Sequence, residues 1–186
     1  MNVILVAVLG WLAIGLEMGL KGTLSLQFGS ATAAPSFVLP LAVFIALCAP
    51  AMQATWTCLI LGAFLDLTAP QAMAGENITV LGPYAVGLVL ACQFVLGIRG
   101  LVIRRHPLAV VMLSAIAAAI MHITVTAFFT VRAILGDPLV WNTSQELLGR
   151  LISAGLTCVT AFFIALTLAP LAPLLGLAAG RGWVRR

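Results

Sequence analysis

The feature that most constrains the fold is a series of six long apolar runs separated by short polar stretches. The runs occupy residues 2–20, 35–49, 51–67, 78–98, 107–131 and 151–168. A helix needs roughly 20 mainly apolar residues to cross about 30 Å of hydrocarbon. Only 8% of the 186 residues are charged, against about 25% in soluble domains, so lipid is the expected solvent. We therefore predict an all-α, polytopic membrane protein with six transmembrane helices in a compact bundle.

The second and third runs are short, and only Ala49 and Pro50 separate them. They form either a tight helical hairpin across the membrane or a re-entrant pair that never spans it. The hairpin is favoured because the combined run is long enough for two crossings at 1.5 Å rise per residue.

The six runs leave no room for a soluble domain of useful size. We expect one membrane domain over residues 1–178 and a basic cytoplasmic tail over residues 179–186. The first run lacks a basic start and a clean cleavage site, which a secretory signal would carry. It is therefore interpreted as a true first helix. No internal repeat is found in the sequence.

The basic residues predict the orientation, because short cytoplasmic loops collect Lys and Arg. Lys21, Arg132 and Arg150 all fall on one side of the predicted topology. Six others fall on the opposite side, in the loop after the fourth run and in the tail: Arg99, Arg104, Arg105, Arg181, Arg185 and Arg186. Both termini are therefore predicted to be cytoplasmic, with the tail beside membrane lipids. No basic stripe interleaved with aromatic residues exists, so nucleic acid is not an expected partner.

Four polar residues lie within the apolar runs. Asp66 ends the third run, Glu17 lies near the outward end of the first, and His122 and Gln93 lie inside the fifth and fourth. Ionisable residues in membrane helices normally face protein or water. One interpretation is a shared polar pocket in the outer half of the bundle. The other places Glu17 and Asp66 at the lipid interface and gives His122 and Gln93 interhelical hydrogen bonds.

Small residues spaced four apart suggest where the helices approach each other closely. The pairs are Gly15 and Gly19, Cys58 and Gly62, Gly87 and Ala91, and Ala115 and Ala119.

Sequence patterns for catalysis are absent: the chain has no Gly-rich phosphate loop, no GxSxG and no HExxH. The cysteines at 48, 58, 92 and 158 lie inside apolar runs without the spacing of metal ligands. We therefore expect no enzymatic activity, no cofactor and no metal.

Residues 40–105 resemble the MreD family of small membrane proteins of the bacterial rod-shape system. The segment "LGAFLDLTAP" at 61–70 is similar to the family's Gly-x-x-x-Asp at the end of the third helix, and Gly62 and Asp66 occupy those two positions. A short loop, the fourth run "LGPYAVGLVLACQ" and the basic stretch "RGLVIRRHP" follow in the family's order.

The resemblance implies a non-enzymatic scaffold in the bacterial inner membrane that helps to organise peptidoglycan synthesis during cell elongation. An MreC-like bitopic protein is the implied partner, with MreB filaments and cell-wall synthases as further contacts. On this interpretation Asp66 holds the outer ends of helices together or contacts a partner helix.

An alternative interpretation stays open. Six helices in under 200 residues are also similar in layout to the substrate-binding S-components of energy-coupling-factor vitamin transporters. Such proteins bind a small molecule in the outer half, where the polar cluster is expected, and depend on a cytoplasmic ATPase module.

Overall fold

The computed structural model describes residues 2–28, 31–69, 71–73, 76–102, 107–135, 143–171, 173 and 175–176. Six helices and two short hairpins make up this part of the chain. In order they are α1 (Val3–Leu24), β1 (Leu26–Phe28), β2 (Ala31–Ala33), α2 (Val38–Cys48), α3 (Ala51–Thr68), β3 (Gln71–Met73), β4 (Glu76–Ile78), α4 (Pro83–Ile98), α5 (Pro107–Ile134) and α6 (Thr143–Leu171). The predicted helical bundle is confirmed, and the two hairpins were not predicted.

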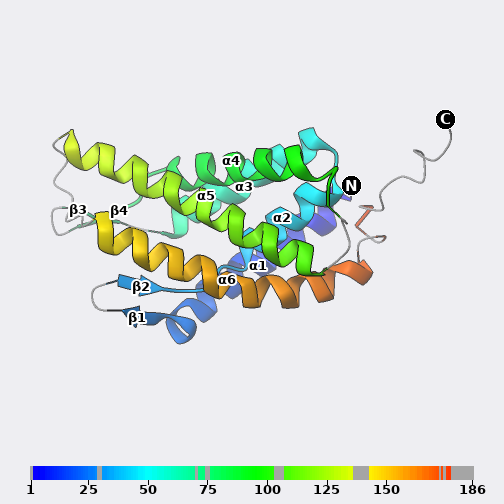
Figure 1. The fold of residues 1–186 in the computed structure, drawn as a ribbon, viewed down its shortest axis with the longest axis horizontal. Coiled ribbons are helices and arrows are strands. Elements are labelled where there is room, and N and C mark those ends of the chain that lie inside the picture. Colours follow the sequence, from blue (N-terminus) through cyan, green and yellow to red (C-terminus); the bar gives the residue numbers. More distant parts are fainter. Residues whose placement is uncertain are drawn as a thin grey trace.

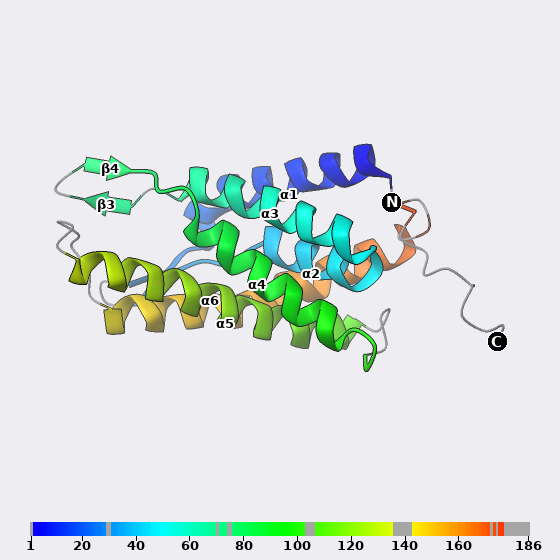
Figure 2. The ribbon, with the colours of Figure 1, turned by 90° about the horizontal axis from the view of Figure 1, so that it is seen from above.

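The helices form an elongated bundle with both hairpins at one end (Figures 1 and 2). We call this the hairpin end. The start of α1 and the end of α6 lie at the opposite end, where the Asn2 backbone N–H donates to the carbonyl of Leu175 over 2.9 Å. The chain therefore begins and ends its helices on the same side of the bundle.

Four helices are long and apolar enough to cross a membrane: Val3–Leu24, Ala51–Thr68, Pro107–Ile134 and the Ser144–Leu171 part of α6. The other two are shorter, with 11 residues in α2 and 16 in α4. At 1.5 Å per residue α2 is only about 16 Å long, roughly half of the hydrocarbon thickness. The four long apolar helices are compatible with a multi-pass membrane protein, whereas the lengths of α2 and α4 do not give six full crossings by helices alone.

The helix α2 lies at the centre of the bundle, where it contacts all five other helices. Ten of its 11 residues are buried, so it forms much of the core. The predicted span 35–49 starts three residues too early, since the helix begins at Val38. Pro40 is tolerated inside because the first turn of a helix has no intrahelical use for its N–H groups.

The helix α1 is the most peripheral, packing against α2 and α3. Only Val6, Gly10 and Ala13 are buried among its 22 residues. Large apolar side chains cover the rest, including Trp11, which is 74% exposed. A surface of this kind needs lipid or another apolar helix against it.

The order of the elements repeats, and this repeat was not predicted from the sequence. A long helix, a hairpin and a short helix appear twice, as α1–β1–β2–α2 and as α3–β3–β4–α4. The starts of β1, β2 and α2 at 26, 31 and 38 precede those of β3, β4 and α4 at 71, 76 and 83 by 45 residues each.

Candidate functional site

Glu17 caps the buried start of α2 from the neighbouring helix α1. Its Oε2 atom accepts hydrogen bonds from the Ser36 hydroxyl at 2.9 Å and from the backbone N–H groups of Phe37 and Val38 at 3.0 Å each. Phe37, at the N-cap of α2, provides no cap of its own. The carboxylate satisfies donors that a helix start otherwise leaves open, and it complements the positive end of the helix dipole.

The extended segment before α2 is held by hydroxyl groups of α6. Ser153 Oγ accepts from the Ala34 N–H at 3.1 Å, and Thr157 Oγ1 accepts from the Ser36 N–H at 3.1 Å. The Thr160 hydroxyl donates to the Ser36 carbonyl at 2.6 Å. Non-helical backbone at membrane depth needs such internal partners, because lipid offers none. The late start of α2 follows from these contacts.

Asp66 of α3 caps the start of α4, in the same way that Glu17 of α1 caps the start of α2. Its Oδ2 atom accepts from the N–H groups of Gly82 at 2.8 Å and Ala85 at 3.1 Å, and its Oδ1 atom accepts from the Tyr84 N–H at 2.8 Å. Pro83 begins the helix and has no N–H to offer. Gly82 has φ of +130°, a conformation that glycine adopts readily. Asp66 is only 1% exposed, so this contact lies fully inside the protein.

Gly62 lies one turn before Asp66 and brings the two helices into backbone contact. A Cβ atom at this position would lie 2.5 Å from the Ala85 Cα and 2.9 Å from the Tyr84 carbonyl oxygen. We call Gly62, Asp66, Gly82 and Ala85 the α3–α4 joint. Both residues of the Gly-x-x-x-Asp pattern are therefore used to attach α4 to α3.

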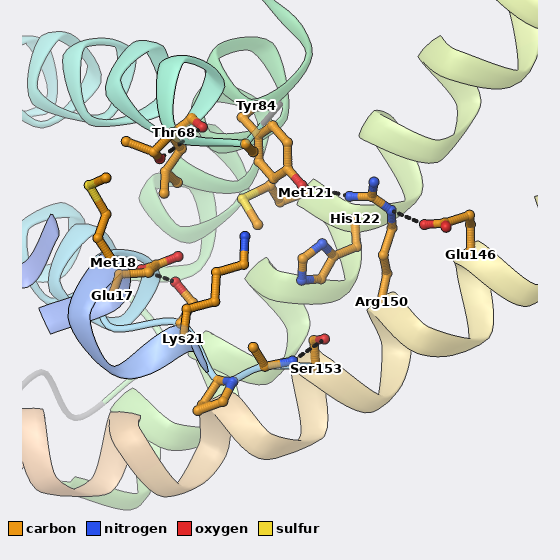
Figure 3. Close-up of a pocket in the computed structure, with 15 residues that line it drawn as sticks. Glu17, Met18, Lys21, Thr68, Tyr84, Met121, His122, Glu146, Arg150 and Ser153 are labelled. Atoms are coloured by element: carbon orange, nitrogen blue, oxygen red, sulfur yellow. Dashed lines mark hydrogen bonds and ion pairs between the residues drawn. The ribbon is translucent and has the colours of Figure 1, made fainter. Parts of the chain in front are cut away.

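A cavity of about 320 Å³ lies in the half of the bundle near the hairpin end, between the last turns of α1 and α3 and the first turns of α4 and α6 (Figure 3). Side chains from α1, α3, α4, α5 and α6 surround it. Its polar and charged lining includes Glu17, Lys21, Tyr84, His122, Glu146 and Arg150. The basic-residue count predicts that this end faces the outside.

The predicted polar cluster is only partly assembled. Glu17 and His122 line the same cavity, whereas Asp66 is not among its lining residues. Gln93 lies elsewhere on α4, where its Nε2 atom donates to the Thr55 hydroxyl of α3 at 3.1 Å. The interhelical hydrogen bond proposed for Gln93 is thus confirmed, and the pocket role proposed for it is not seen.

His122 faces the cavity from the middle of α5 (Figure 3). It is 8% exposed, and its Nδ1 atom has no hydrogen-bond partner among the described residues. Thr126, one turn further along α5, is also buried with an unpartnered hydroxyl in the described part of the chain. Buried polar atoms normally find a partner in the protein or in water. The imidazole is therefore available to a bound molecule.

Sequence reasoning missed Arg150 as a site residue. Its Nη1 atom donates to the Tyr84 hydroxyl at 2.7 Å, its guanidinium lies 5.8 Å from the Tyr84 ring centroid, and its Nε atom lies 3.6 Å from Glu146 Oε2. The predicted sixth run began at 151, which left Arg150 in a loop. The helix begins eight residues earlier, at Thr143. The spacing of Glu146 and Arg150, an acid followed four residues later by a base, indicates a helix there.

Arg99 ends α4 at the end of the bundle opposite the hairpins. Its Nη1 atom donates to the carbonyls of Ala49 at 2.7 Å and Ala46 at 3.4 Å, which close the C-terminus of α2. An arginine near a helix C-terminus satisfies open carbonyls and complements the dipole. The other residues predicted to be cytoplasmic lie outside the described residues: Arg104, Arg105, Arg181, Arg185 and Arg186.

Within the described ranges, no group of three His, Cys, Asp or Glu side chains could hold a metal ion. Comparisons of the chain with protein-family models, with curated proteins and with solved structures found no match. The functional conclusions below therefore rest on the residues and their contacts.

Proposed function

We propose that this chain is a non-enzymatic scaffold of the bacterial cell-elongation machinery, in the inner membrane, that binds an MreC-like bitopic partner. The observation that carries the proposal is the α3–α4 joint. The resemblance to the MreD family rests on Gly62 and Asp66, and both residues have a defined structural task in that joint. The two residues act together in one buried contact, which supports treating the pattern as a unit.

The helix α1 is the proposed binding surface for the partner's single membrane helix. It presents an apolar face with few contacts to the rest of the bundle, and Trp11 and Ile4 are among its most exposed side chains. Helices associate in lipid by close packing of their surfaces. On α1, a Cβ atom built on Gly15 or Gly19 would meet no other described part of the chain within 4 Å. A second helix can therefore approach the α1 backbone closely along this stripe.

Photo-crosslinking tests the proposal at residue resolution. A photoreactive amino acid at Trp11 should crosslink a co-expressed MreC-like protein from the same genome. The matched control is the same amino acid at Phe163 of α6, which is 61% exposed on another helix. Crosslinks of equal yield from both positions, or from neither, would remove α1 as the partner surface.

A second candidate function is supported by the cavity. A polar cavity of about 320 Å³ near one end of a six-helix bundle is what a substrate-binding S-component of a vitamin transporter requires. The two functions predict different co-purified proteins. Affinity purification of the chain from native membranes should recover an MreC-like protein on the scaffold proposal and an ABC-type ATPase pair on the transporter alternative.

A further inference from the structure

We propose that the cavity at the hairpin end binds a small molecule through an oxyanion, a phosphate or carboxylate group, which lies beside Lys21 and His122. The inference goes beyond the scaffold function and does not depend on it. It is carried by the size of the cavity and by two groups of its lining in the described part of the chain. These are the Lys21 ammonium, which Glu17 attracts but which makes no hydrogen bond or close ion pair, and the buried His122 imidazole, whose Nδ1 atom has no hydrogen-bond partner.

The size of the cavity fits an organic molecule that carries the anion. Its volume of about 320 Å³ is roughly ten times the volume that one water molecule occupies in liquid water. It falls at the lower end of the range in which small-molecule sites occur, about 300–1,000 Å³. A free phosphate ion would leave most of this space to water.

The charged groups that line the cavity among the described residues balance, with Glu17 and Glu146 against Lys21 and Arg150, but only Arg150 is held in a close ion pair. The Glu17 carboxylate is occupied by three donors at the start of α2, and Glu146 faces Arg150. Lys21 lies four residues after Glu17, yet no ion pair or hydrogen bond to its ammonium group occurs among the described residues. Its side chain is exposed at the mouth of the cavity and extends toward His122 (Figure 3).

The inner wall supplies hydrogen-bonding groups beside this cation. His122 is more than nine-tenths buried and has an unpartnered Nδ1 atom in the described part of the protein. The Tyr84 hydroxyl accepts from Arg150 and keeps its own proton for donation. An ammonium, a phenol and an imidazole around one space are suited to an oxyanion, because charge-assisted hydrogen bonds to such groups are the strong ones.

The anion can belong to a soluble molecule or to a lipid headgroup, and two arms of one experiment separate these sources. Lys21 is the only lysine in the chain, so its acylation by an amine-reactive reagent can be followed by mass spectrometry without competing lysines. In the first arm, the detergent-purified chain is titrated with glycerol 3-phosphate or succinate, against chloride at equal ionic strength. In the second, the chain is placed in bilayer discs of phosphatidylglycerol or of phosphatidylcholine.

A bound oxyanion that shields the amine completely should slow Lys21 acylation about threefold once the probe reaches twice its dissociation constant. It should also raise the thermal unfolding midpoint of the wild type and of Arg132→Gln, a control cation that does not line the cavity. The rise should vanish in Lys21→Met. Protection only in phosphatidylglycerol discs would assign the anion to lipid. Absence of protection in both arms would overturn the proposal, as would a midpoint rise that persists in Lys21→Met.

Discussion

At the scale of single residues, two carboxylates inside the bundle, the buried Asp66 and the half-buried Glu17, are the most informative features of the chain. The sequence marked Glu17 and Asp66 as unusual because ionisable groups in apolar helices need partners. It did not reveal those partners, which are backbone N–H groups of the following short helix. No side-chain pattern encodes a backbone donor that lies 16–21 residues away along the chain and meets the carboxylate only in the folded bundle.

Replacing Asp66 with alanine should destabilise the bundle by about 3 kcal/mol, because three buried N–H groups lose a charged acceptor. Asp66→Asn should cost less, since one carbonyl oxygen remains to accept. Thermal unfolding in detergent measures both changes.

The matched control is Gln93→Ala, which removes an exposed hydrogen bond between the same two helices. Interhelical hydrogen bonds of this kind contribute about 0.6 kcal/mol on average. Equal losses for Asp66→Ala and Gln93→Ala would show that the Asp66 cap is not a main support of α4. If Asp66→Asn leaves both the fold and the yield of a partner complex unchanged, the residue has no role at the partner interface.

At the scale of the elements, close approach of helices is concentrated at a few small residues. Two of the predicted pairs lie at tight contacts: Gly62 against α4, and Gly87 within 3.1 Å of the Met121 carbonyl oxygen on α5, measured from a Cβ built on the glycine. A Cβ built on Gly15 or Gly19 would contact no other element in the part of the chain that the structure describes. Spacing alone did not separate these cases, because the same pattern serves inner contacts and an outer surface equally well.

Gly62→Ala should therefore lower the unfolding midpoint, since the new methyl group would meet the Ala85 backbone at 2.5 Å and force α3 and α4 apart. Overpacking of this kind costs about 1–3 kcal/mol. Gly15→Ala is the control: it has open space and should be neutral or slightly stabilising in a helix. A midpoint unchanged by Gly62→Ala would contradict the backbone contact.

The extended segment before α2 allows a separate test. Thr157→Val keeps the shape of a side chain that is 0% exposed and removes the acceptor for the Ser36 N–H. The buried donor left open should cost about 1–3 kcal/mol of unfolding free energy. Thr167→Val on the same helix removes an exposed hydroxyl bonded only to its own helix, and it should have little effect. If the two variants lose similar amounts of unfolding free energy, the hydrogen bond from the Ser36 N–H to Thr157 does not stabilise the fold.

At the scale of the whole molecule, hydropathy predicted the helical bundle, whereas the bounds of its helices and the course of the segments between them depend on tertiary contacts. The six runs correspond to six helices, and α6 ends at Leu171, directly after the Pro170 that the sequence contains there. The runs did not predict that residues 34–36 stay extended, because that depends on hydroxyls of α6 more than 115 residues away. The three-residue strands were missed because they are too short to show an alternating pattern.

We propose that the bundle lies in lipid with its hairpin end outside and with the start of α1 and the end of α6 on the cytoplasmic side. Labelling of single cysteines in intact and inverted membrane vesicles, in a variant without the four natural cysteines, tests it most directly. Cysteine at Leu101, after α4, should react from the cytoplasmic side together with cysteine at Asn2, and cysteine at Leu135, after α5, should react from the outside. Reaction of Leu101→Cys and Leu135→Cys from the same side would contradict the account, because the 28-residue α5 would then fail to cross the membrane.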